Sequence, residues 1–237
     1  MTIMLFRNDA YLDQTPARVE AVTQDGSIML DQTVFYATSG GQPGDVGMLT
    51  LDDGRQIAIE NTVHPGGDKL RIAHVPAAGQ DLPVVGAAVL AAIDWPRRHR
   101  LMRMHTALHL LSVAMPYPVT GGSIGADKGR LDFAMPEAPG DLAQVEAELN
   151  AYVAADLPVS SEWISDEEMA AKAELIKTMK VKPPMGQGRV RLVRIGEIDL
   201  QPCGGTHVRS TGEIGPLKLG KLENKGAQNK RLSLLFA

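Results

Sequence analysis

A single long helix is predicted from Asp94 until Met115 and Pro116 end it, and the interpretation of the rest of the chain depends on it. Asp94 suits the N-cap, and Pro96 suits the first turn, where its missing N–H removes no hydrogen bond. Apolar residues recur at helical spacing along it, at Leu101, Met104, Leu108 and Leu111. His105 and His109 stand four residues apart, so their rings leave the same face of the helix and can reach one metal ion.

A second candidate for metal binding lies about a hundred residues further on, at residues 201–207. Cys203 is the only cysteine of the chain, and His207 follows it by four positions, across two glycines that can turn sharply. Three imidazoles and one thiolate form a tetrahedral set that suits zinc. The alternatives are two histidines that are merely hydrogen-bonded beside the core and a buried, inert cysteine.

The composition limits the classes of function that the chain can have. The net charge of −4 gives no global signature of nucleic-acid binding, so such binding would need local basic patches. Basic residues cluster at residues 97–103, 177–182 and 218–231, although each cluster could also be a solvated face. One cysteine excludes an internal disulfide and fits a reducing cytoplasm, and no apolar run is long enough to span a bilayer.

Residues 1–90 are predicted to form a small β domain. Short β-rich runs, separated by turn signals, occur at residues 18–22, 27–30, 47–51, 56–60 and 69–74, a spacing that suits a compact barrel. A further strand, at residues 87–93, leads into the helix with the two histidines. The glycine-rich residues 33–47 form either a loop whose N–H groups approach a phosphate or ribose, or a long hairpin loop.

Residues 91–237 are predicted to form an α+β domain, an antiparallel sheet with helices. Residues 120–123 are predicted as a turn, and one helix is predicted from Asp141 to about residue 155. Another helix starts at Ser165 and ends before Lys182. Strands are predicted at residues 130–134, 158–164, 189–195, 217–222 and 230–236.

Several of these motifs resemble the editing domain of alanyl-tRNA synthetase. The resemblance is closest to its freestanding relatives, the AlaX-type alanyl-tRNA editing proteins of medium length. The matching pieces are residues 35–45, 94–95, 105–111, 122–123, 132–133, 203–207, 223–226 and 230–231, in the family order. Threonyl-tRNA synthetase editing modules have a similar metal core, but Ser39-Gly40-Gly41-Gln42-Pro43-Gly44-Asp45 and Cys203-Gly204-Gly205-Thr206-His207 favour the alanyl branch. We expect neither an aminoacylation domain nor an ATP site.

The resemblance implies a trans-acting deacylase that hydrolyses the ester of serine, and as a second substrate glycine, on tRNA(Ala). It implies one zinc ion per chain, with His105, His109, Cys203 and His207 as ligands. Since four protein ligands fill a tetrahedron, zinc either orders the pocket or has a ligand that can leave. The partner is mischarged tRNA, and we expect a monomer in the cytoplasm.

Five other residues are candidates for the catalytic site. The resemblance implies a residue near the substrate hydroxyl at Thr120, which, or as second choice Thr106, would supply the hydroxyl that distinguishes serine from alanine. Asp132 would orient a ligand histidine, unless it is an ordinary aspartate at the end of a strand. By resemblance, Gly40 and Gly41 belong to a glycine motif that takes part in editing.

Two other functions remain open at the level of the sequence. The first is a zinc-stabilised module that binds tRNA without hydrolysing it. The second is a metallohydrolase for another ester or amide, although the His-Glu-x-x-His protease signature is absent because Thr106 stands where the glutamate would be. Mischarged tRNA distinguishes the three functions, since an enzyme deacylates it, a binding module protects it and an unrelated hydrolase ignores it.

Overall fold

The computed structural model describes residues 2–137, 140–172, 175–178, 188–226 and 228–237. The chain forms two compact units. The first contains Met1–Ser39 and Pro43–His99, and the second contains Gly40–Gln42 and Arg100–Ala237. Helix α1 (Trp95–Ala114) therefore begins in the first unit and continues in the second. No helix in the described part of the chain combines the length and apolar character that a membrane span requires.

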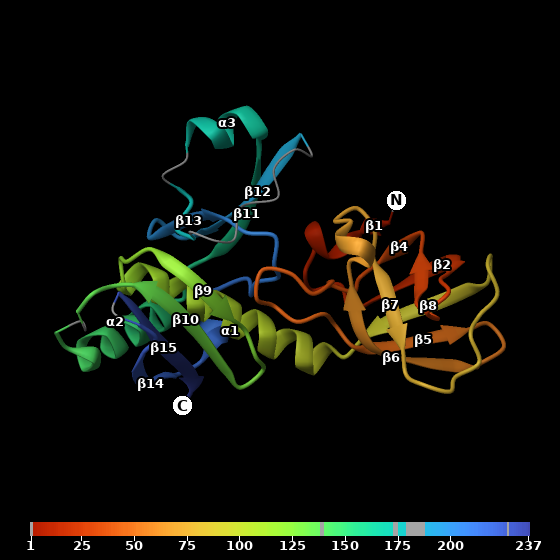
Figure 1. Cartoon of the computed structure of the whole chain (residues 1–237), viewed down its shortest axis with the longest axis horizontal. Helices are drawn as coiled ribbons and strands as arrows, with labels where there is room; N and C mark the ends of the chain where they lie inside the picture. Colours follow the sequence, from red (N-terminus) through yellow and green to blue (C-terminus); the bar gives the residue numbers. More distant parts are fainter. Residues whose placement is uncertain (1, 138–139, 173–174, 179–187, 227) are drawn as a thin grey trace. The chain divides into compact units, whose positions relative to one another are not determined.

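The first unit contains a closed barrel with strand order β2-β3-β7-β6-β5-β8 (Figure 1). Its strands are β2 (Gln14–Val22), β3 (Ile28–Leu30), β5 (Gly47–Leu51), β6 (Gln56–Val63), β7 (Ala73–Pro76) and β8 (Ala88–Ile93). A short parallel pair, β1 (Ile3–Met4) and β4 (Gln32–Thr33), and the turns η1 (Leu5–Arg7) and η2 (Pro65–Gly67) complete the unit.

Alternation of buried and exposed side chains explains why these segments close into a barrel. Along β2, for example, Thr15, Ala17 and Val19 are buried while the residues between them are exposed. The interior is filled by branched and aromatic side chains such as Phe35 and Leu49. The α+β class and the barrel are confirmed, but the strand predicted at residues 69–74 begins only at Ala73.

A buried ion pair fixes the start of α1 within the first unit. Arg98 is fully buried and donates from Nε to Asp45 Oδ1 at 2.9 Å, and from Nη2 to the main-chain oxygen of Val34 at 2.7 Å. Asp94 accepts from the Arg97 amide at 3.0 Å, as the predicted N-cap should. The first turns of the helix are therefore held by the glycine-rich segment that contains Asp45.

The second unit combines two antiparallel sheets with helices (Figure 1). A four-stranded sheet has the order β14-β15-β10-β9, and a three-stranded sheet has the order β11-β12-β13. The elements after α1 are β9 (Val119–Ser123), β10 (Lys128–Ala134), α2 (Leu142–Ala154), β11 (Val159–Ser165), α3 (Asp166–Ala171), β12 (Arg189–Ile195), β13 (Asp199–Pro202), η4 (Thr211–Ile214), β14 (Leu217–Asn224) and β15 (Asn229–Phe236). Helix α1 packs tightly on the larger sheet, because a Cβ on Gly129 would lie 2.7 Å from Met104 Sδ.

One local prediction for this unit is wrong, and one is borne out with a shorter helix. Residues 120–123 form most of β9 rather than a turn, since Gly122 pairs with Leu131 of β10. A Cβ added to Gly122 would lie 3.1 Å from the Leu131 side chain. Helix α3 begins at the predicted Ser165 capping box but ends at Ala171, well before Lys182, which lies outside the described residues. Strand β13, which was not predicted, leads directly into Cys203.

Candidate metal centre

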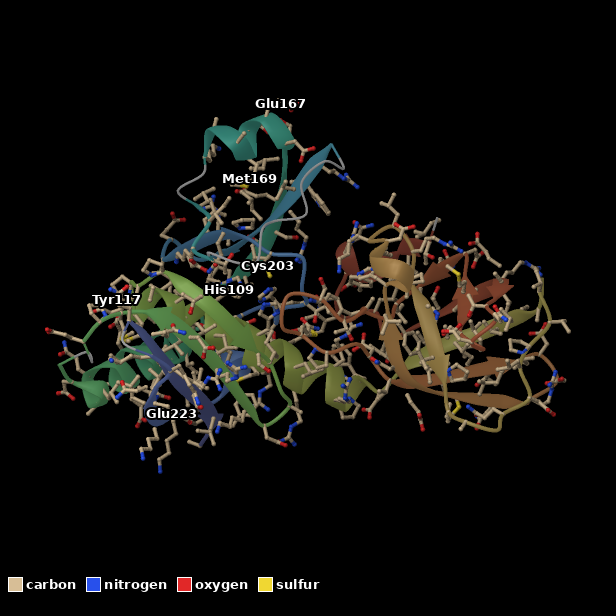
Figure 2. All side chains as sticks on the ribbon, in the orientation of Figure 1. His109, Tyr117, Glu167, Met169, Cys203 and Glu223 are labelled. Atoms are coloured by element: carbon tan, nitrogen blue, oxygen red, sulfur yellow. The ribbon has the colours of Figure 1, made fainter. Side chains whose placement is uncertain are left out.

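The second unit brings together the four side chains that the sequence singled out as metal ligands. Figure 2 labels two of them, His109 and Cys203. His105 and His109 project from one face of α1 with ring centroids 5.2 Å apart, as the four-residue spacing predicts. Cys203 and His207 come from the loop that follows β13. One potential ligand atom from each of the four lies within 4.8 Å of the others, and the cluster could hold a metal ion.

Two of the histidines have acceptors at Nδ1. His105 Nδ1 lies 3.0 Å from the side-chain oxygen of Gln42, and His109 Nδ1 lies 3.2 Å from Asp199 Oδ2. An amide oxygen and a carboxylate only accept hydrogen bonds, so both rings must carry a proton on Nδ1. In its neutral form each ring then has a free electron pair on Nε2, which is the form that binds metals.

His207 reaches the same state through a hydroxyl group. Its Nδ1 lies 3.1 Å from Thr106 Oγ1, which also donates to the main-chain oxygen of Met102 at 3.0 Å. Because the Thr106 hydroxyl has only one proton, it accepts from His207. The Nε2 atoms of His207 and His105 lie 3.3 Å and 3.5 Å from Cys203 Sγ. The donor atoms thus converge on Cys203.

Gln42 is held in one orientation by three hydrogen bonds. Its oxygen also accepts from the Thr206 amide at 3.1 Å, and its Nε2 donates to Thr206 Oγ1 at 2.8 Å. The side chain is fully buried. Since a Cβ on Gly205 would lie 2.3 Å from His105 Cε1, only glycine leaves room for the His105 ring.

The cluster shifts the pKa values of Cys203 and His109 in opposite directions. Burial raises the pKa of the Cys203 thiol, but its electrostatic interactions and hydrogen bonds with the neighbouring imidazole rings outweigh burial and bring the pKa well below 9.0. Burial lowers the pKa of His109, but its hydrogen bonds to Asp199 and Cys203 raise it to about 9. A metal ion that binds at His109 must therefore displace a proton.

Thr120 and Asp132 lie on neighbouring strands of the four-stranded sheet. The Thr120 hydroxyl lies 2.8 Å from Asn229 Oδ1 and 3.1 Å from the main-chain oxygen of Asp132. The Asp132 carboxylate accepts from Arg130 at 2.9 Å and from Arg231 at 2.7 Å. The carboxylate that contacts a histidine of the cluster is Asp199, which sequence reasoning missed, as it missed Gln42. The only available signal for Asp199 was its position four residues before Cys203.

Gly40 and Gly41 have backbone conformations that favour glycine, with φ of 57° and 85°. The Gly41 oxygen accepts from the Ile124 amide at 2.9 Å, and a Cβ on Gly41 would lie 3.0 Å from the Gly122 oxygen. The two glycines thus bring the segment before Gln42 against the end of β9.

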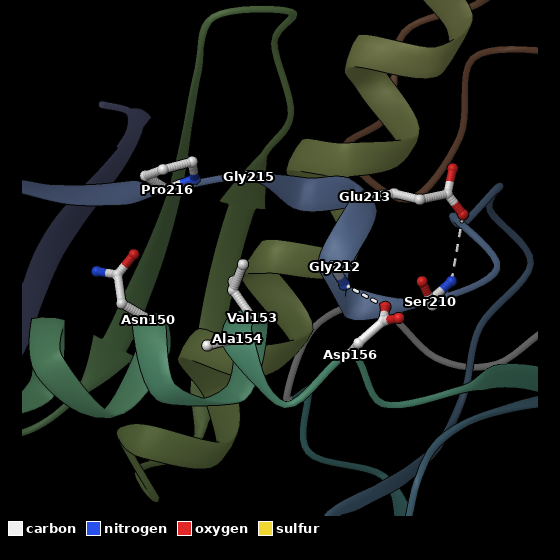
Figure 3. A pocket seen from close by; sticks show the side chains of 9 residues that line it. All are labelled: Asn150, Val153, Ala154, Asp156, Ser210, Gly212, Glu213, Gly215 and Pro216. Atoms are coloured by element: carbon white, nitrogen blue, oxygen red, sulfur yellow. Dashed lines mark hydrogen bonds between the residues drawn. The ribbon is translucent and has the colours of Figure 1, made fainter.

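A separate hollow of about 700 Å³ lies between α2 and η4 (Figure 3). Its two acidic side chains are engaged by main-chain amides: Gly212 donates to Asp156 at 3.0 Å, and Ser210 donates to Glu213 at 3.3 Å. None of the residues that line it belongs to the His-Cys cluster. We therefore assign it no ligand.

Comparison with known proteins identifies the family. The chain is 36% identical to the alanyl-tRNA editing protein AlaX-M of Methanosarcina acetivorans over 247 aligned positions, which cover 98% of both chains. The chain belongs to the alanyl-tRNA editing proteins. It is also 33% identical to AlaX-L of Pyrococcus horikoshii, of which it covers 55%, and 37% identical to the alanine–tRNA ligase of Pyrobaculum arsenaticum, of which it covers 25%. These matches include 95% and 92% of this chain.

Two family models match different parts of this alanyl-tRNA editing protein. Residues 190–233 match the second additional domain of threonyl and alanyl tRNA synthetases, and this range contains Cys203 and His207. Residues 3–97 match the class II (A) tRNA synthetases. The resemblance to AlaX proteins of medium length, inferred from the sequence motifs, is confirmed.

Proposed function

We propose that this chain is a trans-acting deacylase that hydrolyses the ester between tRNA(Ala) and a wrongly attached amino acid. Serine is the proposed amino acid, with glycine second. The observation that carries the proposal is the cluster of three Nε2 atoms and one thiolate in a chain that matches AlaX-M along almost its whole length. We assign residues 1–90 of the chain to a barrel domain and residues 91–237 to the editing domain. We place the protein in the cytoplasm.

We further propose that the cluster holds one zinc ion per chain, through His105, His109, Cys203 and His207. Three nitrogens and a thiolate are a donor set that zinc prefers. In a tetrahedron with usual zinc bond lengths, a nitrogen and a sulfur ligand lie about 3.6 Å apart. The nitrogen–sulfur distances from His207 and His105 to Cys203 are 3.3 Å and 3.5 Å, so these three side chains need little movement to bind.

Zinc bound there would lower the pKa of a water molecule or polarise the ester carbonyl. The side chains around the cluster prepare for it by holding each histidine in the metal-binding tautomer. Gln42 does so for His105, Asp199 for His109 and Thr106 for His207. We therefore assign Thr106 to positioning His207 rather than to contact with the amino acid.

Recognition of serine is assigned to Thr120. A pocket that fits serine cannot refuse alanine by shape, because alanine is smaller by one hydroxyl group. A polar group that alanine leaves without a partner can refuse it. Arg130 and Arg231 hold Asp132, whose main-chain oxygen contacts Thr120, so we assign Asp132 to fixing this strand. Gly40 and Gly41 then complete the site along β9.

Deacylation of mischarged tRNA tests the proposal. Zinc-loaded protein should release serine from Ser-tRNA(Ala) and release alanine from Ala-tRNA(Ala) much more slowly. The Cys203→Ala variant should lose this activity. Binding that protects Ser-tRNA(Ala) from spontaneous hydrolysis would instead identify a binding module. A protein that neither binds nor deacylates either tRNA would refute the proposal. Comparison of metal-free and reloaded protein then distinguishes a zinc that takes part in hydrolysis from one that only orders the site.

A further inference from the structure

The buried carboxylate of Asp199 is the hydrogen-bonding centre behind the metal cluster. Its side chain is fully buried at the start of β13. Oδ2 accepts from His109 Nδ1 at 3.2 Å and from Gln201 Nε2 at 2.7 Å. Oδ1 accepts from the ammonium of Lys177 at 2.6 Å. Both oxygens are therefore used, one toward the cluster and one toward Lys177.

Lys177 is held in place from a second side. Its main-chain oxygen accepts from the Val119 amide at 3.0 Å, and the next residue, Thr178, pairs in parallel with Val119. Val119 begins β9 and directly precedes Thr120. Lys177 thus joins the carboxylate behind His109 to the strand that we assign to amino-acid recognition. Its side chain is 30% exposed, so the ammonium is partly shielded from water.

We infer that Asp199 and Lys177 form a positioning pair for the metal centre, an inference that rests on the proposed zinc site. Asp199 fixes the His109 ring and keeps its proton on Nδ1, so that Nε2 faces the metal. Lys177 compensates the buried negative charge and limits the carboxylate to the rotamer that reaches His109. A buried carboxylate needs such compensation, because an unpaired charge is costly away from water.

Asp199→Asn separates this role from simple packing, because asparagine keeps the shape and replaces one oxygen by an NH₂ group. If the NH₂ group takes the position of Oδ1, it faces the Lys177 ammonium, donor against donor. If it takes the position of Oδ2, it faces the donors of His109 and Gln201. Either orientation disturbs His109, and zinc should bind about 10–100-fold more weakly, as is usual for loss of an outer partner of a metal ligand.

Lys177→Met allows the asparagine to relax. Without the ammonium, the NH₂ group can occupy the Oδ1 side while its oxygen accepts from His109. The effect of Asp199→Asn on zinc affinity should therefore be at least about fivefold smaller in the Lys177→Met background than in the wild type. A carboxylate that only fills space would give the same effect in both backgrounds.

The experiment measures zinc dissociation constants by competition with a chromophoric chelator for the wild type, both single variants and the double variant. Glu162→Gln is the matched control, since it removes a carboxylate whose ion pair with Arg194 is exposed, on β11 at the other edge of the same three-stranded sheet. ¹⁵N NMR of the zinc-loaded protein should show the Nδ1–H signal of His109 in the wild type and its displacement in Asp199→Asn.

Two results would overturn the inference. Zinc affinity of Asp199→Asn within twofold of that of Glu162→Gln would remove Asp199 from the pair. If Asp199→Asn weakens zinc binding equally in the wild-type and Lys177→Met backgrounds, Lys177 has no part in positioning His109. This comparison uses only variants that bind zinc and unfold cooperatively. A wild-type protein that binds no zinc would instead refute the metal site itself, so the two failures are distinguishable.

Discussion

Replacing Gly205 by alanine would place a methyl group inside the metal cluster. The new Cβ would lie 2.3 Å from His105 Cε1, 2.6 Å from His105 Nδ1 and 2.9 Å from Gln42 Oε1. Carbon atoms in ordinary contact are about 3.5 Å apart, so the His105 ring would have to retreat by about 1 Å. The adjacent Gly204 is a matched control, since no described atom lies within 4 Å of a Cβ built there.

The cost of this retreat falls mainly on the metal-bound state. In the metal-free protein the ring can move away from the methyl group, but zinc binding requires Nε2 to return. Overpacking of this size costs about 1–3 kcal/mol, which corresponds to about 5–150-fold weaker zinc binding. The displaced ring would also weaken its bond to Gln42, which places the expected loss in the upper half of that range.

Zinc affinity by chelator competition is the assay, with thermal unfolding of the metal-free proteins as a check of folding. We expect Gly204→Ala to bind zinc within about threefold of the wild type, and Gly205→Ala to fall in the calculated range. Equal affinities of the two variants would refute the reasoning, because they would mean that zinc binding does not depend on the observed position of His105.

Four other predictions follow from the same structure. Gly41→Ala should reduce deacylation and thermal stability more than Gly40→Ala: both require φ > 0, but only Gly41 would press a Cβ against β9. Thr120→Val should lower the ratio of serine to alanine deacylation at least about tenfold. Lys225→Glu should weaken tRNA binding and reduce the slope of its salt dependence, measured by titration. Burial lowers the pKa of His74 to about 4 in the folded protein. As the pH falls, the unfolded chain therefore protonates this histidine at a higher pH than the folded protein does. Stability should therefore fall by up to about 3 kcal/mol between pH 6.5 and 4, and less in His74→Gln, as measured by denaturant unfolding.

Local signals in the sequence were sufficient for much of the fold. The bounds of α1 follow from Asp94 and Pro96 at its start and from Met115 and Pro116 at its end, and the structure bears out both bounds. The barrel follows from short alternating runs with turns between them. These features depend on residues within a few positions of one another, which is the range over which capping and periodicity act.

Strand β9 shows where local signals fail. Its two glycines, Gly121 and Gly122, are typical of a turn in isolation. In the structure, a Cβ on Gly122 would lie 3.1 Å from the Leu131 side chain of β10, which is closer than an ordinary contact. Glycine is thus favoured here by close packing against a neighbouring strand, a tertiary cause that the local sequence does not contain.

In the candidate metal centre, too, the residues set by local spacing could be predicted, and those set by tertiary contacts could not. The four proposed ligands could be found because each pair, His105 with His109 and Cys203 with His207, has a four-residue spacing that lets both side chains reach one metal ion. Their partners could not, since they lie 63, 90 and 101 residues from the histidines that they hold. These partners are an amide, a carboxylate and a hydroxyl, so they share no residue type that a motif could capture. The site requires only an oxygen acceptor at each Nδ1, and the chain meets that requirement wherever the fold brings one within reach.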